Sequence, residues 1–103
     1  MSILADPIPD ILEDIDQEEA FEPLHRVIIH NDEVTPYDFV ILVLQKIFKL
    51  KPLEAEHVTF VAHSSGQALV AILPLTEAQK RVGKAHFAAS LEGYPLMFTI
   101  EPE

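Results

Sequence analysis

The side chains best suited to chemistry lie in one short segment and at one distant histidine. Asn31, Asp32 and Glu33 directly follow the apolar segment 26–30 (RVIIH), and His63 comes much later in the chain. A carboxamide, two carboxylates and a neutral imidazole can all accept hydrogen bonds, so together they suit an ammonium ion and offer little to an anion. The group predicts a site for a cationic head group. An ordinary turn is the alternative at residues 31–33, because Asn and Asp are common turn formers.

His63, taken alone, is more typical of a helix-end residue whose ring bonds to the backbone than of a ligand-binding residue. The patterns of other chemistries are missing from the sequence. The chain has no cysteine, which excludes a thiolate nucleophile and a cysteine zinc site. Its histidines show no H-E-x-x-H spacing, and its three glycines form no phosphate-binding loop.

Ser64 and Ser65 lie beside His63 but lack the G-x-S-x-G context of a nucleophilic serine. We therefore expect no catalytic residue, no metal and no cofactor, and a protein that is not an enzyme. An acid-base enzyme that uses Asp32 and His63 is the least supported alternative.

Charge is distributed unevenly along the 103 residues. The chain has 7 Lys and Arg against 17 Asp and Glu, a formal net charge of −10. Residues 1–24 hold eight of the acids, three prolines and no Lys or Arg. Such a segment buries too little apolar surface to order itself. The sequence thus predicts an acidic flexible N-terminal extension over residues 1–23 and a core domain over residues 24–103.

The same charge pattern argues against two classes of partner. No basic stripe is present to hold phosphates, so we expect neither nucleic acid nor an anionic membrane as a partner. No apolar run approaches the roughly 20 residues that span a bilayer. The absence of a signal-type segment and of cysteine favours a cytoplasmic location.

Apolar periodicity and turn residues predict the elements that position these groups. The expected order is β-α-α-β-α-β, an α+β fold. Segment 49–66 is ambiguous, because VTFVA alone is typical of a strand, while Pro52 and the glutamates after it are typical of a helix start. We predict a helix closed by Gly66. The elements are a strand at 26–30, a helix from 36, a helix from 52, a strand at 67–74, a helix from 76 to 93 and a strand at 96–102.

Capping patterns and helical faces add detail to this prediction. Thr35 with Asp38 and Thr76 with Gln79 each form the S/T-x-x-E/Q/D pattern of a capping box. The apolar faces expected on the three helices, at helical spacing, are Phe39, Val40, Val43, Leu44, Ile47 and Phe48; Ala55, Val58, Thr59, Ala62 and His63; and Ala78, Val82, Ala85 and Ala89.

Three segments together resemble the ClpS adaptor family: RVIIHNDEVTPYDFVILVLQKIF (26–48), HVTFVAHSSG (57–66) and YPLMFTIE (94–101). The resemblance runs over residues 24–101. It implies the fold of that family, which is similar to the C-terminal domain of the ribosomal stalk protein, with a three-stranded antiparallel sheet packed against three helices. It also implies an adaptor that binds proteins with N-terminal Leu, Phe, Tyr or Trp and delivers them to a Clp AAA+ unfoldase, ClpA- or ClpC-like, for degradation by the Clp protease.

The resemblance assigns roles to particular residues. Asn31, Asp32 and His63, with Glu33 alongside, would bind the free α-amino group of the substrate. Tyr37, Val40, Thr59, Ala62 and Leu96 would form a hydrophobic pocket for its first side chain. Tyr37 replaces the Met of better-known members, and Thr59 and Ala62 replace larger apolar residues, so the pocket floor is expected to be roomier or more polar.

The unfoldase contact implied by the resemblance involves Thr76, Glu77 and Arg81, and the acidic extension would engage the ATPase during delivery. The alternative is a protein-protein scaffold that has the ClpS or ribosomal stalk-like fold but no pocket for an N-terminal residue. In that case the apolar helix FVILVLQKIF would be the contact surface.

Overall fold

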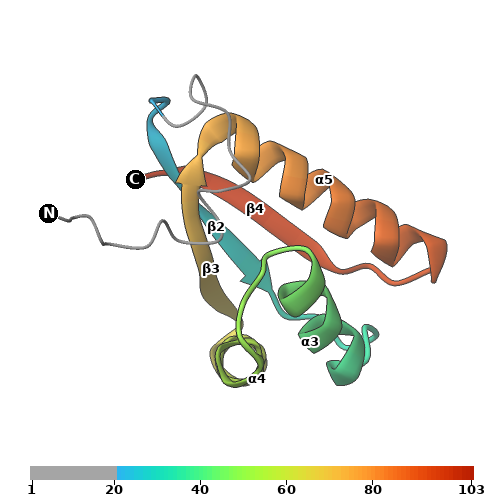
Figure 1. The fold of residues 1–103 in the computed structure, drawn as a ribbon. Helices are drawn as coiled ribbons and strands as arrows, with labels where there is room; N and C mark the ends of the chain where they lie inside the picture. Colours follow the sequence, from blue (N-terminus) through green and yellow to red (C-terminus); the bar gives the residue numbers. More distant parts are fainter. Residues whose placement is uncertain (1–20) are drawn as a thin grey trace, which may run out of the picture.

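The computed structural model describes residues 21–103, which form a three-stranded antiparallel sheet and three helices (Figure 1). The predicted α+β fold and its β-α-α-β-α-β order are confirmed. The predicted extension, except for its last three residues, lies outside the described residues. The elements are β2 (Leu24–His30), α3 (Tyr37–Lys46), α4 (Pro52–Ser65), β3 (Gln67–Pro74), α5 (Leu75–Leu91) and β4 (Met97–Pro102).

The sheet has the order β3-β2-β4, so the short β-branched strand β2 is central and pairs antiparallel with both neighbours. At the end of β2, His30 pairs with Gln67 at the start of β3 and with Met97 at the start of β4. The loop after β2 therefore emerges beside Gly66, the last residue before β3, and beside Leu96, the last residue before β4. This register decides which distant residues meet the loop.

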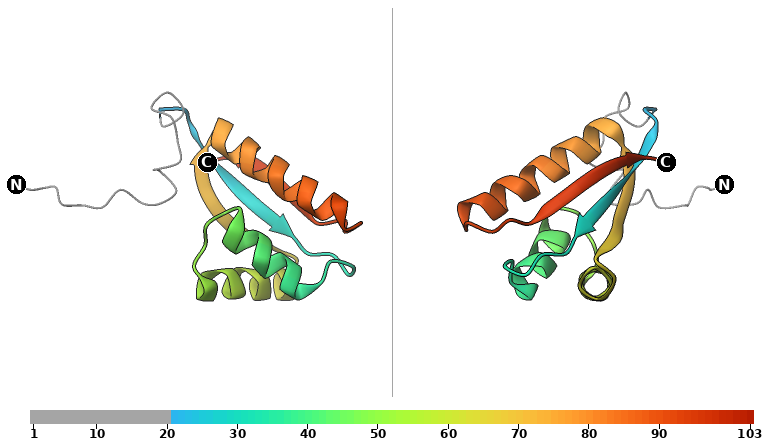
Figure 2. Two further views of the ribbon diagram at one scale, coloured as in Figure 1. Left: turned by 45° about the vertical axis from the view of Figure 1, so that its right-hand side comes forward. Right: turned by 180° about the vertical axis from the view of Figure 1, so that it is seen from behind.

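The helices occupy two places around the sheet (Figures 1 and 2). Helix α5 contacts all three strands and covers one face, where Ala78, Val82, Ala85 and Ala89 are buried as predicted. Helices α3 and α4 pack against each other beyond the end of the sheet where β2 ends and β3 begins. Their position puts the start of α3 and the end of α4 next to the loop after β2.

Segment 52–65 is a helix, as predicted, and the neighbouring residues explain why. At its start the Lys51 N–H donates to Glu54 Oε1 at 3.0 Å. At its end Gly66 has φ +95°, a left-handed conformation that favours glycine, and its N–H donates to the Ala62 carbonyl. Ala55, Thr59 and Ala62 of the predicted face are buried, and Val58 is partly buried. His63, expected on that face, is exposed beside it.

Both predicted capping boxes are wrong. Helix α3 begins at Tyr37 after Pro36, and α5 begins at Leu75 after Pro74, and neither has the predicted side-chain cap. The hydroxyl of Thr35 instead donates to Asp32, which precedes it, and that of Thr76 donates to Glu22. The local pattern failed because the hydroxyl of each threonine is already hydrogen-bonded to a carboxylate from outside the helix.

Candidate functional site

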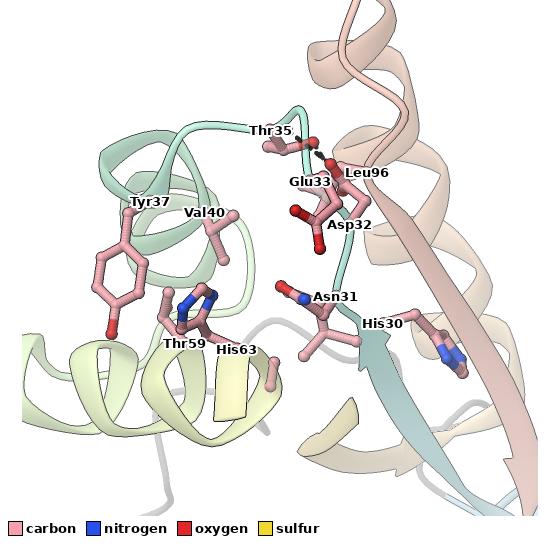
Figure 3. A pocket seen from close by; sticks show the side chains of 12 residues that line it. His30, Asn31, Asp32, Glu33, Thr35, Tyr37, Val40, Thr59, His63 and Leu96 are labelled. Atoms are coloured by element: carbon pink, nitrogen blue, oxygen red, sulfur yellow. Dashed lines mark hydrogen bonds between the residues drawn. The ribbon is translucent and has the colours of Figure 1, made fainter. Parts of the chain in front are cut away.

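A cavity of about 200 Å³ lies where the loop after β2, the start of α3, the end of α4 and the residue before β4 meet (Figure 3). A single water molecule needs roughly 10–15 Å³ on a comparable measure, so the cavity accommodates a much larger group. Its lining residues are Ile29, His30, Asn31, Asp32, Glu33, Thr35, Tyr37, Val40, Thr59, Ala62, His63 and Leu96.

All nine residues predicted for the amino-group site and the hydrophobic pocket line this one cavity. The structure brings them together from four separate parts of the chain. A backbone hydrogen bond helps to hold them, because the Asn31 N–H donates to the Gly66 carbonyl oxygen at 2.9 Å. That bond joins the acceptor-rich loop to the end of α4, three residues beyond His63.

The carboxylate of Asp32 organises the loop. Oδ1 accepts hydrogen bonds from the backbone N–H groups of Val34 (2.8 Å) and Thr35 (2.6 Å), and Oδ2 accepts one from the Thr35 hydroxyl (2.8 Å). Desolvation raises the pKa of Asp32, but the hydrogen bonds from Thr35 and Val34 outweigh it and lower that pKa below its usual 3.8. Asp32 therefore stays ionised and still has lone pairs for a cation.

The side chains of Asn31 and Glu33 lie on one side of the cavity, facing the helices, and His63 lies across from them on α4 (Figure 3). The ring of Tyr37 stands edge-on to that of His63, with centroids 6.0 Å apart and planes at 84°. This contact places the exposed phenol of α3 beside His63 in the lining of the cavity. His63 is thus positioned by an aromatic neighbour.

The remaining walls are apolar. Val40, Ala62 and Leu96 are all buried, and they come from α3, α4 and the segment before β4. Thr59 is also buried, and its Oγ1 donates to the Ala55 carbonyl oxygen at 2.7 Å. Since that hydroxyl is bonded within α4, Thr59 adds no unpaired polar group to the floor. The small side chains of Thr59 and Ala62 leave room for an apolar group.

Ile29, His30 and Thr35 line the cavity but were not predicted. His30 points away from it toward β4, where Nε2 and the Thr99 hydroxyl are hydrogen-bonded at 2.7 Å (Figure 3). Thr35 takes part through Asp32, and the spacing of the two, an acid three residues before a threonine, is a turn pattern that could have predicted their contact.

The three residues predicted for an unfoldase contact differ in exposure. Thr76 is partly exposed, whereas Glu77 and Arg81 are 6% and 3% exposed. Arg81 Nε donates to Glu77 Oε2 at 2.7 Å, and another guanidinium nitrogen donates to the Ile47 carbonyl oxygen at 3.1 Å. In this conformation the pair ties α5 to the end of α3, and its side chains offer almost no surface to a partner.

Over residues 21–103, no three His, Asp or Glu side chains are grouped so that they could hold a metal ion. None of the helices in the same range is long and apolar enough to cross a bilayer.

Comparisons with known proteins agree with the family resemblance seen in the sequence. The family model of the ATP-dependent Clp protease adaptor protein ClpS matches residues 20–99. ATP-dependent Clp protease adapter protein ClpS 2 of Mesorhizobium japonicum is 40% identical over 80 residues, which cover 78% of this chain and 79% of that protein. ClpS 1 of Bradyrhizobium diazoefficiens is 39% identical over 80 residues, with the same coverage of both chains.

A solved structure is similar in fold as well as in sequence. Agrobacterium tumefaciens ClpS2 bound to L-phenylalaninamide superposes with a TM-score of 0.76 and 34% sequence identity. The match covers 79% of this chain and 98% of the other. The resemblance noted in the sequence and the predicted architecture are both confirmed by these comparisons.

Proposed function

Because the chain belongs to the ClpS family of ATP-dependent Clp protease adaptor proteins, we propose that its cavity binds the N-terminal residue of a substrate protein. The cavity takes the free α-ammonium group and a bulky hydrophobic side chain, namely Leu, Phe, Tyr or Trp. The adaptor then delivers the bound protein to a Clp AAA+ unfoldase for degradation by the Clp protease.

One observation carries this proposal: a single cavity is lined both by hydrogen-bond acceptors and by apolar side chains. An N-terminal residue matches both parts of this lining, since its ammonium group and its side chain are attached to the same carbon atom. L-phenylalaninamide, the ligand of the Agrobacterium protein, has the same combination of an amine and an aromatic side chain.

The acceptors supply the affinity for the charge. Asn31 Oδ1, the Asp32 carboxylate and a neutral His63 ring nitrogen take the three ammonium protons, and Glu33 adds negative charge at the rim. Each hydrogen bond to a charged group contributes roughly 1.5–3 kcal/mol. An acetylated terminus has no charge and adds a carbonyl oxygen to an acceptor-rich site, so it is rejected.

The apolar walls supply the selection among side chains. Burial of a Leu or Phe side chain contributes roughly 1.5–3 kcal/mol. Val40, Ala62 and Leu96 receive the side chain, and Tyr37 at the opening restricts residues that are branched at Cβ, such as Ile and Val. After the usual costs of association, the two halves suggest an affinity on the order of micromolar.

The partner ATPase is a ClpA- or ClpC-like unfoldase, and the contact includes the start of α5 around Thr76. The burial of Glu77 and Arg81 supports an indirect role for them, in which they hold α5 in place. A cytoplasmic location belongs to the proposal and fits a chain without cysteine.

Fluorescence anisotropy with labelled peptides tests the proposal. Peptides that begin with Phe or Leu are compared with the same peptides after N-terminal acetylation, and with peptides that begin with Val. We expect binding of the free Phe and Leu termini and at least tenfold weaker binding of the other two. Equal binding of free and acetylated peptides would overturn the proposal and favour the scaffold alternative.

A further inference from the structure

A second cleft, with a volume of about 370 Å³, lies between the end of α3 and the first half of α5. Among the described residues, five of the seven Lys and Arg of the chain line it, together with one carboxylate, that of Glu77. We call this the basic cleft. Its lining residues are Lys46, Ile47, Lys49, Glu77, Lys80, Arg81 and Lys84. Such a gathering of positive charge is notable in a chain whose formal net charge is −10.

The one carboxylate in the basic cleft is already matched by a cation. Glu77 and Arg81 form a buried ion pair at the base of the cleft. Lys46 and Lys84 lie exposed around it, and among the described residues that line the cleft Glu77 carries the one carboxylate against five Lys and Arg side chains. The basic cleft therefore has a positive potential that suits a polyanionic segment.

Glu22 shows where the N-terminal extension joins the core. Its carboxylate accepts hydrogen bonds from the Thr76 backbone N–H and from the Thr76 hydroxyl, both at 2.8 Å. These bonds lower the pKa of Glu22, and the nearby charge of Lys80 adds to the effect. The chain is thus attached at the first turn of α5, beside the basic cleft.

Distances along α5 put the rest of the basic cleft within reach of this attachment. Lys80 and Lys84 are one and two helical turns beyond Thr76, about 6 and 12 Å along the axis. Glu18 and Glu19 precede Glu22 by three or four residues, and four extended residues span up to about 13 Å. Residues 1–20 contain seven Asp and Glu and no Lys or Arg.

We propose that the acidic residues ahead of Glu22 bind the basic cleft of their own chain. Attachment through Glu22 keeps them at a high local concentration, so even weak charge pairing favours the intramolecular contact. The contact depends on ionic strength, because exposed charges are screened within roughly 10 Å at 0.1 M salt. It also covers the side of α5 on which the unfoldase contact is proposed, so the extension and the unfoldase would compete there.

Paramagnetic relaxation enhancement in the full chain tests this contact. The chain has no cysteine, so Gln17→Cys supplies a single position for a nitroxide label between Asp16 and Glu18. At low salt we expect the label to broaden the amide signals of Lys46, Lys80 and Lys84 more than those of the exposed face of α4. The enhancement should fall at least threefold in 0.5 M salt.

Charge variants make the test specific. Replacing Lys46, Lys80 and Lys84 together by Gln should reduce the enhancement at least threefold, while Lys51→Gln, outside the basic cleft, should leave it unchanged. Enhancement that is insensitive to the triple variant, or equal over α4 and the cleft, would overturn the proposal. Enhancement in a mixture of labelled chains and separate isotope-enriched chains would also overturn it, since the contact would then lie between copies.

None of these readouts uses a peptide or an unfoldase. Failure of the intramolecular contact would therefore leave the proposed binding of N-terminal residues untouched, and failure of peptide binding would leave this contact untouched.

Discussion

The backbone N–H of Asn31 donates a hydrogen bond to the carbonyl oxygen of Gly66 at 2.9 Å. Asn31 begins the acceptor-rich loop after β2, and Gly66 ends the helix that presents His63. The bond uses only main-chain atoms, so it holds the loop and the helix end together whichever side chains they bear. It makes the side chains at positions 31 and 63 available for a ligand without changing the frame that carries them.

Removing either of two acceptor side chains, Asn31 or His63, should weaken peptide binding without unfolding the protein. Asn31→Ala keeps the backbone bond to Gly66 and loses one hydrogen bond to the ammonium group, so affinity for a Phe-initiated peptide should fall roughly tenfold or more. His63→Ala should have a similar effect, as measured by fluorescence anisotropy. His57→Ala, on the same helix but outside the cavity, serves as the control. A similar loss in His57→Ala would contradict the assignment.

The charge of Asp32 can be separated from its role in the turn. In Asp32→Asn the remaining Oδ1 can still accept from the Val34 and Thr35 N–H groups, so the free energy of unfolding should change by less than about 1 kcal/mol. Peptide affinity should fall more than tenfold, because the ammonium loses its counter-charge. Thr35→Val removes a neutral donor and should change affinity less than threefold. The idea fails if Asp32→Asn binds as well as the original protein.

The pKa of Asp32 determines where acid disrupts the loop. Desolvation raises this pKa, but the hydrogen bonds from Thr35 and Val34 lower it by more, so the folded value lies below the usual 3.8. A depressed carboxyl pKa contributes stability above the unfolded value of about 3.9, and that stability is lost as pH falls through the folded value. NMR titration of the Thr35 amide should therefore show a transition below pH 4 and none between pH 5 and 8. The transition should be absent in Asp32→Asn.

The size of the pocket should set its preference for large side chains. Ala62→Leu places three more carbon atoms against a cavity of about 200 Å³, so affinity for a Phe-initiated peptide should fall at least tenfold. Thr59→Val should change affinity less than threefold, since the Thr59 hydroxyl is bonded to Ala55 and not to the ligand. Thermal denaturation shows whether each variant is folded. Unchanged binding by a folded Ala62→Leu would exclude Ala62 from the pocket.

The buried ion pair between Glu77 and Arg81 should contribute to the free energy of unfolding. Arg81→Ala leaves the Glu77 carboxylate buried without its main partner, a change that typically costs about 3–5 kcal/mol. Lys84→Ala, an exposed change one turn further along α5, should cost less than about 0.5 kcal/mol. Urea denaturation followed by circular dichroism measures both. If Arg81→Ala kept full stability and lost only unfoldase binding, a direct contact would replace the structural role.

The hydrophobic pattern along the chain determined the order and type of the elements. Three local signals were enough: the helical periodicity of α3 and α5, the β-branched residues of β2 and the glycine at the end of α4. Each signal depends only on residues close together in the sequence, so it can be recognised without knowing the fold. The types of Asn31, Asp32 and His63 likewise limit the chemistry, because each of them can accept a hydrogen bond from an ammonium ion. The family resemblance added the pairing of His63 with the loop, which spacing by itself does not contain.

Tertiary structure decided which groups are partners. The carboxylate bonded to Thr76 comes from Glu22, 54 residues earlier in the chain, and the guanidinium of Arg81 donates to the Ile47 carbonyl oxygen, 34 residues earlier. A local pattern can state which bonds a side chain is able to make, but the choice among them depends on groups that only folding brings near. For the cavity, the strand order β3-β2-β4 determines which residues meet. It places the end of α4 and Leu96 beside the loop after β2, and these parts line the cavity together.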